Sequence, residues 1–371
     1  MRKWDAIMSE PHVVVDPVLL RDFSARMMEA AGASVHAARL VADSLVAANL
    51  RGVDSHGVQL LPPYVERLQR GDIDAHATGR VVSENGACLV YDAANAIGQT
   101  VSGICCDHAV RLARSHGAGV VVARESNHFG AAAYWAQRIS DAGMIGIVLC
   151  NASPLVAPWQ GKDRRLGTNP ICMSAPGDRL WLLDMATTTV ALNKVFKAAA
   201  TGQETIPAGW AMDANGNPTT GTAAAIAGSP LPLGGYKGSG LAMMVEILCA
   251  VLSGGAISTE LGGLRLEGRP MRVSQFFLAL DVARFMPVAE FTARMEHLRK
   301  TVKSSAPAPG YDEVLLAGDP EWRIETERAR DGIPIQPAIW KSLSDVAEKL
   351  NIPVPAQRSE SASEPGCPLG T

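Results

Sequence analysis

The segment Ala118–Gly130 reads AGVVVARESNHFG, and its character changes halfway along. The first half is a run of small and β-branched apolar residues, which predicts a buried strand. Three hydrogen-bonding side chains follow, Ser126, Asn127 and His128, directly before a helix that we expect over 131–142. A strand that ends at a helix N-terminus is where α/β proteins place ligands and anions. The plainer alternative is an ordinary Ser/Asn helix cap with a histidine nearby.

Strands and helices both surround this segment. Apolar runs between turn residues predict strands, and apolar residues at helical spacing behind capping residues predict helices. We expect strands at 80–91 (a hairpin turning on Asn85-Gly86), 118–125, 144–151, 169–186 (a second hairpin) and 275–281. We expect helices from Asp16, from Ser34 to Gly52, and over about 60–69, 100–115, 131–142 and 237–252. The pattern predicts an α/β fold of the α+β type, with a helical layer and a mixed sheet layer.

The order of these elements predicts domains that are discontinuous in sequence. We expect a helical domain at 12–78, joined by helices from about 186–262 and by the C-terminal region. A mixed region of sheet and helix is expected at 79–350. Residues 356–371 are rich in Ser, Pro, Gly and Glu, and we expect this tail to be disordered.

The composition disfavours several classes of partner. The chain has 371 residues and 47% hydrophobic residues, enough for a sizeable core. The formal net charge of −3, with no run of Lys or Arg longer than two, disfavours nucleic acid. No apolar run approaches the ~18–20 residues of a membrane span. The seven cysteines lie mostly in apolar stretches without paired spacing. We therefore expect a soluble, cytoplasmic protein that binds neither nucleic acid nor membranes.

The common nucleotide and metal motifs are missing from the sequence. There is no G-x-G-x-x-G after a strand, no Walker loop, no H-E-x-x-H and no G-x-S-x-G elbow. The histidines are scattered and none has a partner at a metal-ligand spacing, so no metal site is expected. The residues alone therefore predict no Rossmann-type cofactor site.

A second polar cluster, Asp54, Ser55 and His56, lies in the stretch NLRGVDSHGVQLL at Asn49–Leu61. Histidine is the side chain best suited to proton transfer near neutral pH, and the neighbouring Asp54 and Ser55 are expected to hold its ring. The alternative is that Asp54 caps the next helix and His56 is a packing residue.

Two further segments combine glycine with charged or aromatic residues. Pro158–Pro170 reads PWQGKDRRLGTNP, a long loop of the kind that is usually functional or disordered, and Trp159 argues against disorder. Leu233–Glu246 reads LGGYKGSGLAMMVE, and its glycines bracket Lys237 at the start of an apolar helix. Such a helix start can cradle a phosphate, although a flexible turn before a core helix is an equal alternative.

Taken in order, these clusters resemble the type 2 malate/L-lactate dehydrogenase family, also called the malate/sulfolactate dehydrogenase-like family. Six family motifs recur: R-G-x-D-S-H-G, S-N-H-x-G, L-G-T-N-P, D-M-A-T, I-P-x-G-W-A-x-D-x-x-G-x-P-T and G-G-x-K-G-x-G-L. In this chain they lie at Arg51–Gly57, Ser126–Gly130, Leu166–Pro170, Asp184–Thr187, Ile206–Thr219 and Gly234–Leu241. Each motif alone would be weak, but six in this order are specific.

The resemblance implies an NAD(P)-dependent oxidoreductase without a Rossmann domain. Family members interconvert 2-oxo and 2-hydroxy acids such as malate, lactate, sulfolactate and ureidoglycolate. One branch reduces cyclic imino acids such as piperideine-2-carboxylate. The implied fold is a mainly antiparallel mixed sheet domain that binds NAD(P), packed on a discontinuous helical domain and assembled as a homodimer. The alternatives to a 2-hydroxy-acid dehydrogenase are a cyclic ketimine or N-alkyl amino-acid reductase and a catalytically idle family member.

The resemblance also implies roles for individual residues. His56 and His128 match two histidines to which proton transfer has been assigned, and we favour His56. The positions that match cofactor contacts are Asp184, Met185, Ala186, Lys237, Gly318 and Asp319. The positions expected to bind substrate are Ser55, Leu60 and Tyr64. Whether the cofactor is NAD or NADP is left open.

The chain departs from the family pattern at several positions. In many members an arginine lies four residues after the first histidine, where it can pair with the substrate carboxylate. This chain has Leu60 there, which favours a larger apolar substrate or a carboxylate held elsewhere. The segment Cys150–Pro154 also lacks the serine of the family's T-N-S-x-P motif. Both histidines are retained, so no loss of catalysis is expected.

Overall fold

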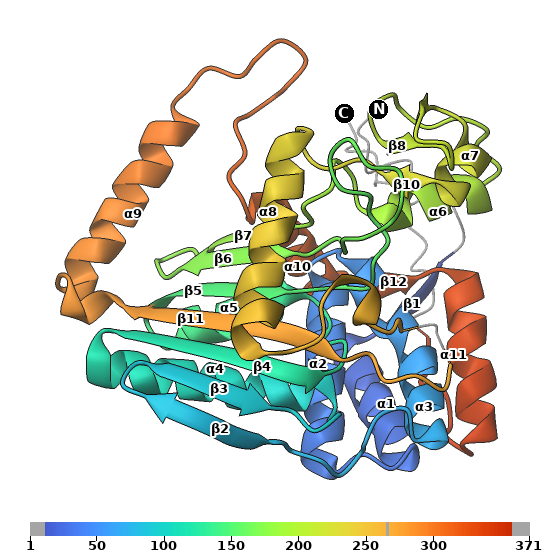
Figure 1. Ribbon diagram of the computed structural model, residues 1–371, viewed down its shortest axis with the longest axis horizontal. Helices are drawn as coiled ribbons and strands as arrows, with labels where there is room; N and C mark the ends of the chain where they lie inside the picture. The colour runs from blue at the N-terminus through green and yellow to red at the C-terminus, as the bar shows by residue number, and fades with distance from the viewer. Residues whose placement is uncertain (1–11, 265–266, 358–371) are drawn as a thin grey trace, which may run out of the picture.

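A seven-stranded sheet forms the centre of the computed structural model, which describes residues 12–264 and 267–357 (Figure 1). The strand order is β2-β3-β4-β11-β5-β6-β7. Their bounds are β2 Arg80–Asn85, β3 Cys88–Asp92, β4 Ala118–Ser126, β5 Met144–Cys150, β6 Ile171–Ala175, β7 Trp181–Met185 and β11 Val273–Asp281. Neighbours within this sheet are antiparallel, except for the parallel pair β3–β4. The expected mixed sheet is confirmed.

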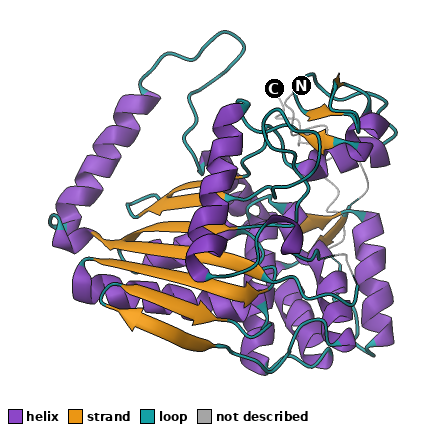
Figure 2. Cartoon of the chain, in the orientation of Figure 1, coloured by secondary structure: helices purple, strands orange, loops and turns teal. Residues whose placement is uncertain are grey.

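Strand β4, the first half of the opening segment, lies in the interior of the sheet between β3 and β11. Its alternate side chains point to opposite faces, so Val121 and Ala123 join the core behind the sheet while Val122 packs in front. The rear core is closed by two helices, α4 Gly98–His116 and α5 Ala132–Asp141 (Figure 2). Strands buried on both faces need apolar residues at every position, which explains the valine run.

The helical layer is built from both ends of the chain. It contains α1 Pro17–Ala30, α2 Val35–Leu50, α3 Leu61–Arg70, α11 Pro337–Lys349 and the strand pair β1 Val13–Val15 with β12 Ile333–Ile335. Asp16 and Ser34 cap α1 and α2 by accepting the N–H groups of Val18 and Ala37, as their sequence positions predicted. Gly71 ends α3 in the left-handed conformation.

The helices between residues 186 and 262 pack outside the apolar core of this layer, and the domain division expected from the sequence stays a prediction. Helices α6 Leu192–Ala200 and α7 Thr222–Ala227 bury their apolar faces against each other and form a separate small core with a three-stranded sheet. That sheet consists of β8 Ala211–Met212, β9 Pro218–Thr219 and β10 Ser229–Pro230. Helix α8 Tyr236–Glu246 and the π-helical segment Ile247–Val251 pack on the front of the large sheet.

Several elements were not expected from the sequence. Helices α9 Val288–Lys303 and α10 Asp319–Asp331 follow β11, and α9 has no buried residue. Short 3₁₀ helices occur at Asp54–His56, Val58–Leu60, Ser258–Glu260 and Val282–Arg284. No helix of the described residues is long and apolar enough to cross a membrane. The tail that we expected to be disordered lies, from residue 358 on, outside the described residues.

The start of α4 lies against Asn127 and His128, the residues directly after β4. A Cβ atom added at Gly98 would lie 2.4 Å from the carbonyl oxygens of Asn127 and His128. A methyl group at this distance must displace backbone, because neither carbonyl belongs to a flexible side chain. Glycine at this position therefore allows the helix and the strand end to meet.

We predict that Gly98→Ala lowers the free energy of unfolding by about 1–3 kcal/mol, the usual range for overpacking. Urea denaturation measures this change. The matched control is Gly240→Ala, where no atom lies within 4 Å of the added Cβ. Alanine within a helix is better than glycine, so this control should gain roughly 0.5–1 kcal/mol. Equal effects of the two substitutions would contradict the close approach at Gly98.

Candidate active site

The turn between α2 and α3 is held by the side chain of Asn49. Its Oδ1 accepts the N–H of Val58 at 2.8 Å, and its Nδ2 donates to Oδ1 of Asp54 at 2.6 Å. A Cβ at Gly57 would lie 2.2 Å from the Asn49 amide oxygen, so only glycine fits beside it. These contacts fix the turn that carries His56.

The role expected for Asp54 is wrong in part, because its carboxylate does not hold His56. Arg328 on α10 donates to both Asp54 oxygens, at 2.6 and 3.1 Å, and Asn49 supplies a further hydrogen bond. These contacts tie the turn to the C-terminal part of the chain. The ring of His56 instead pairs through Nδ1 with Oγ of Ser55, at 3.0 Å. A hydroxyl can donate or accept, so this contact permits both protonation states of the ring.

The two candidate histidines lie together, although they come from different layers. The rings of His56 and His128 stack with their centroids 5.8 Å apart and their planes 18° from parallel. His56 comes from the turn after α2, and His128 from the loop after β4. Both side chains keep part of their surface accessible. The helical layer and the sheet therefore build one site where they meet.

The environment of His128 fixes which of its nitrogens carries the proton. The backbone N–H of Gly130 donates to Nδ1 at 3.2 Å, and the hydroxyl of Tyr64 lies 2.5 Å from the same atom. An N–H group can only donate, so Nδ1 must be an acceptor. Neutral His128 then carries its proton on Nε2, and Tyr64 donates to Nδ1 as well.

Burial favours the neutral form of both rings. It lowers the pKa of His56 below the ordinary 6.5. Burial, and secondarily the charge of His56, lower the pKa of His128 to about 3. Burial raises the pKa of Tyr64, which keeps its hydroxyl protonated as a donor. Both rings are therefore favoured in their neutral forms at neutral pH.

Asp184, the first candidate for cofactor contact, lies at the end of β7 and contacts the helix that follows His128. Its Oδ2 accepts the N–H of Ala133 at 2.9 Å, in the first turn of the helix that follows His128. Desolvation by the surrounding protein raises its pKa to about 6, although solvent still reaches the residue. Met185 and Ala186 follow on the same strand end and are partly exposed.

Lys237 is brought to the same region by pairing between two loops. The N–H of Leu233 donates to the carbonyl of Thr187 at 2.9 Å, and a Cβ at Gly238 would lie 2.5 Å from that carbonyl. The exposed Lys237 therefore stands at the N-terminus of α8, close to the continuation of β7. The positive end of a helix with a lysine beside it fits a phosphate group.

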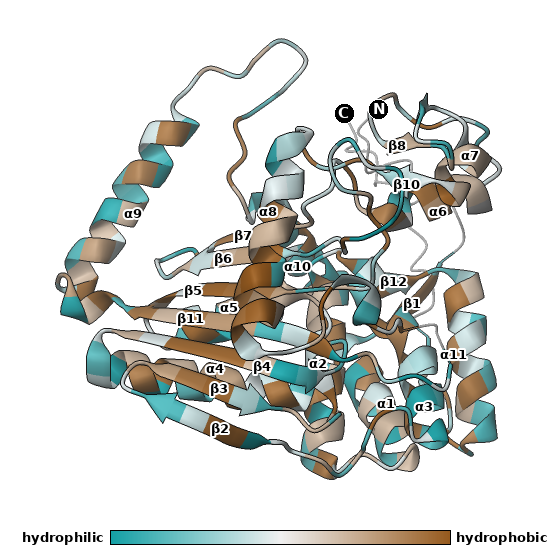
Figure 3. Cartoon of the chain, in the orientation of Figure 1, coloured by the Kyte–Doolittle hydropathy of each residue, from teal (hydrophilic) through white to brown (hydrophobic). Residues whose placement is uncertain are grey.

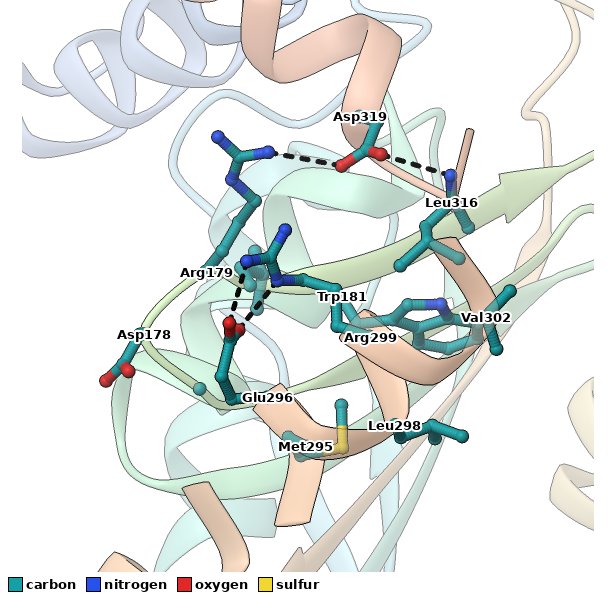
Figure 4. A pocket seen from close by; sticks show the side chains of 13 residues that line it. Asp178, Arg179, Trp181, Met295, Glu296, Leu298, Arg299, Val302, Leu316 and Asp319 are labelled. Atoms are coloured by element: carbon teal, nitrogen blue, oxygen red, sulfur yellow. Dashed lines mark hydrogen bonds and ion pairs between the residues drawn. The ribbon is translucent and has the colours of Figure 1, made fainter. Parts of the chain in front are cut away.

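Gly318 and Asp319 lie in a loop beside β7. A Cβ at Gly318 would lie 3.3 Å from the carbonyl of Leu182, so this loop touches the strand that carries Asp184. The buried Asp319 carboxylate is bound by protein groups. Lys303 donates to it at 2.6 Å. Arg179 donates to it at 3.3 Å (Figure 4). The Asp319 carboxylate therefore serves to position the loop, and cofactor contact at Gly318 stays a prediction.

Leu60, expected to bind substrate, belongs mostly to the core of the helical layer. Only 8% of its surface is exposed, and it packs in the same apolar cluster as Tyr64. Ser55 and Tyr64 contact the two histidines, as described above. Substrate contact at these three positions stays a prediction.

One group that supports the site was missed from the sequence. Glu246, buried in α8, accepts hydrogen bonds from the amides of Asn151 at 3.3 Å and Asn169 at 3.1 Å. These contacts fix α8 to the loops after β5 and before β6. A lone glutamate within an apolar helix was the available signal, because a buried carboxylate needs partners. In residues 12–264 and 267–357, no group of three or more His, Cys, Asp or Glu side chains is placed to hold a metal.

The fold and the site together define an α/β protein that pairs two histidines at a strand end without a Rossmann glycine turn. Residues 15–344 match the family described as Malate/L-lactate dehydrogenase. The chain is 36% identical over 352 residues to malate dehydrogenase of Pyrococcus horikoshii, covering 92% of this chain and 97% of the relative. The solved structure of that enzyme matches with a TM-score of 0.85. The chain therefore belongs to the malate/L-lactate dehydrogenase family and is a dehydrogenase.

Two further relatives show the range of the family. Ureidoglycolate dehydrogenase (NAD(+)) of Escherichia coli O157:H7 is 33% identical over 317 residues, covering 84% of this chain and 90% of the relative. The structure of delta1-piperideine-2-carboxylate reductase from Pseudomonas syringae has a TM-score of 0.81 at 29% identity, covering 90% of this chain and 99% of that one. The family membership predicted from six ordered motifs is confirmed.

We predict that Tyr64→Phe raises the pKa of His128, because the hydroxyl that donates to its neutral Nδ1 is lost. Histidine NMR with ¹⁵N labels measures both the pKa and the tautomer. The matched control is Ser55→Ala, which removes the hydroxyl beside His56 and should leave the His128 tautomer unchanged. An unchanged His128 titration in Tyr64→Phe would show that this hydrogen bond does not act as described.

Proposed function

We propose that the chain is an NAD(P)-dependent oxidoreductase that interconverts a 2-oxo acid and a 2-hydroxy acid, with a histidine as proton donor and acceptor. The observation that carries this proposal is the stacked pair His56–His128. It is supported by two contacts: the helix that follows His128 binds the Asp184 carboxylate at the end of β7, and the segment after β7 pairs with the loop before α8. The names of the relatives, which include dehydrogenases of 2-hydroxy acids, support the substrate class.

We assign proton transfer to His56. Reduction of a carbonyl builds negative charge on its oxygen, which needs a proton from a group that titrates near the working pH. The ring of His56 can hold a second proton, because Ser55 Oγ can accept from its Nδ1. His128 cannot gain a proton at Nδ1 without losing the hydrogen bond from Gly130. His128 thus acts as a neutral donor through Nε2 and orients the substrate oxygen.

The residues at the front of β7 fit a nicotinamide dinucleotide. The cationic Lys237 and the positive end of α8 suit the phosphates, and the Gly318 loop lets a ligand approach the backbone. When bound, the cofactor supplies or accepts the hydride. Asp184 orders the start of α5, and through it the loop that carries His128. The choice between NAD and NADP is part of the test below.

Reduction of a cyclic ketimine or an N-alkyl imine is the second candidate function. The observation that favours it is Leu60, an apolar residue in place of the arginine that many members use to pair with a carboxylate. The likeness to the piperideine-2-carboxylate reductase structure agrees with it. The hydride and the proton donor are the same, and only the reduced bond, C=N in place of C=O, differs.

Two assays test the function. Absorbance at 340 nm follows NADH and NADPH with a panel of 2-oxo acids and cyclic imines, and we expect turnover with one class. Thermal unfolding with each nucleotide is the binding control, since a ligand at one hundred times its Kd stabilises the fold by about 2.7 kcal/mol. Stabilisation of the fold by a nucleotide without turnover would show that only the proposed substrate class is wrong. Neither turnover nor stabilisation would favour an idle family member.

The proton-transfer role predicts the effect of removing His56. His56→Gln should lower kcat about 10²–10⁴-fold, the usual range for general acid–base catalysis, with little change in cofactor Kd. His128→Gln is the matched comparison, because glutamine keeps a donor near the Nε2 position and should cost less. A larger loss in His128→Gln would transfer the role to His128.

The lowered pKa of His56 also predicts the pH dependence. Oxidation of a hydroxy acid needs neutral His56, so kcat/KM for oxidation should be level above pH 6.5 and fall as the pH drops through the lowered pKa. Reduction needs protonated His56, so kcat/KM for reduction should fall as the pH rises through the same value. Steady-state profiles in both directions measure this, and His56→Gln should lose the dependence in each.

A further inference from the structure

The side chain of Gln99 is buried close to the histidine pair. Gln99 lies in the first turn of α4, directly after Gly98, the residue that meets the carbonyls of Asn127 and His128. Helix α2, which contacts α4 from the helical layer, carries apolar residues where the two layers meet (Figure 3). Only 1% of Gln99 is exposed. Gln99 is therefore out of reach of a substrate, and any effect on the reaction must pass through another side chain.

The amide nitrogen of Gln99 is a buried donor without a well-formed hydrogen bond. Within residues 12–264 and 267–357, its Nε2 has no partner of ordinary geometry. A Cβ atom added at Gly130 would lie 3.9 Å from this nitrogen. The N–H of Gly130 is the group that donates to Nδ1 of His128. An unpaired donor is costly when buried, so the acceptor that it faces matters for the site.

That acceptor is the hydroxyl oxygen of Tyr64. Burial raises the pKa of Tyr64, whereas the side chain of Gln99 and, after it, the backbone of Gly130 lower that pKa. A neighbour that hydrogen-bonds to the ionised oxygen of a phenol lowers its pKa, and only a donor can do this. Gln99 therefore presents its nitrogen, and not its oxygen, to Tyr64.

The direction of the Tyr64 proton decides what this residue offers to His128. When the hydroxyl points at Nδ1, it donates there, and its lone pairs remain available to accept. When the hydroxyl points away, a lone pair faces Nδ1, which favours a proton on Nδ1 and leaves Nε2 without one. The contact from Tyr64, at 2.5 Å, is shorter than that from Gly130, at 3.2 Å. Tyr64 is thus the stronger of the two influences on the ring.

We propose that Gln99 is a positioning residue, whose Nε2 donates to the Tyr64 oxygen and thereby directs the Tyr64 proton to Nδ1 of His128. The chain of donors Gln99, Tyr64, His128 then runs in one direction and ends at the Nε2–H of the imidazole. This proposal rests on the proposed role of His128 as a neutral donor to the substrate oxygen. It adds a group from the sheet layer that keeps this donor in the required tautomer.

Ser44 supplies another oxygen near Gly130, at 3.7 Å from the same added Cβ. Its hydroxyl donates to the carbonyl of Val41 at 2.8 Å, within α2. Nothing in this contact directs the Tyr64 proton. Ser44→Ala is therefore the matched control, because it removes a buried polar group at the same place without removing the donor to Tyr64.

Histidine NMR with ¹⁵N labels tests the proposal on the full chain at neutral pH, without substrate or cofactor. The wild type should carry the His128 proton on Nε2. Gln99→Met, which keeps the length of the side chain and removes the amide, should move the His128 Nδ1 resonance downfield as the bond from Tyr64 weakens. Ser44→Ala should leave it in place. With an active substrate, Gln99→Met should lower kcat roughly 3–10-fold, the value of one hydrogen bond, and leave the nucleotide Kd unchanged.

A double-mutant cycle shows whether Gln99 acts through Tyr64. In the Tyr64→Phe background, Gln99→Met should move the His128 resonance no further. An unchanged resonance in folded Gln99→Met, an equal further shift in the double variant, or a wild-type proton on Nδ1 would each overturn the proposal. Circular dichroism reports folding, and Gln99→Asn, which withdraws the amide by one methylene, replaces Gln99→Met if that variant does not fold. Absence of turnover with every substrate would refute the proposed function and leave the NMR result to decide on Gln99.

Discussion

The contact between the start of α4 and the end of β4 is the constraint on which the site depends. The backbone of Gly98 meets the carbonyls of Asn127 and His128 with no room for a side chain. This contact sets where the strand ends and hence where His128 stands. His56 reaches the same point from the helical layer, through a turn fixed by Asn49 and Gly57. The stacked rings are thus a product of two layers packing, and neither layer contains the site alone.

Much of the fold could be predicted, because its signals are local. The N-caps Asp16 and Ser34, the Asn85-Gly86 turn and the valine run of β4 each specify their element by short-range physics. Helix α10 was missed because it buries little, so its sequence lacks the apolar stripe on one face that reports a core. Helix α9 was missed although its sequence carries such a stripe from Val288 to Val302, none of which is buried. The division into domains stays a prediction, because amphipathic spacing shows that one face of a helix is buried but not which surface covers it.

The candidate site was predictable as a set of residues but not as a set of contacts. Motif order placed His56, His128, Asp184 and Lys237 in one family. The structure stacks the two histidines, binds Asp184 to the helix that follows His128, and pairs the segment after β7 with the loop before Lys237. The partners of these residues are long-range and leave no local trace. Asp54 pairs with Arg328, which lies far away in the sequence. The Tyr64 hydroxyl on α3 contacts His128 in the loop after β4. Leu60 looked like a change in substrate contact, yet it is largely a core residue.

The interleaving of the chain has a consequence for how the protein is made. Strand β11, from residues 273–281, lies between β4 and β5, and β12 near residue 335 pairs with β1 near residue 13. During synthesis the ribosome releases β4 and β5 long before the strand that must separate them. Their edges then stay unpaired for seconds at ordinary elongation rates, which favours aggregation or protection by a chaperone. Arg328 must also be synthesised before it can hold the turn at Asp54. A nascent chain whose synthesis stops before Arg328 therefore lacks part of the contacts that support the site.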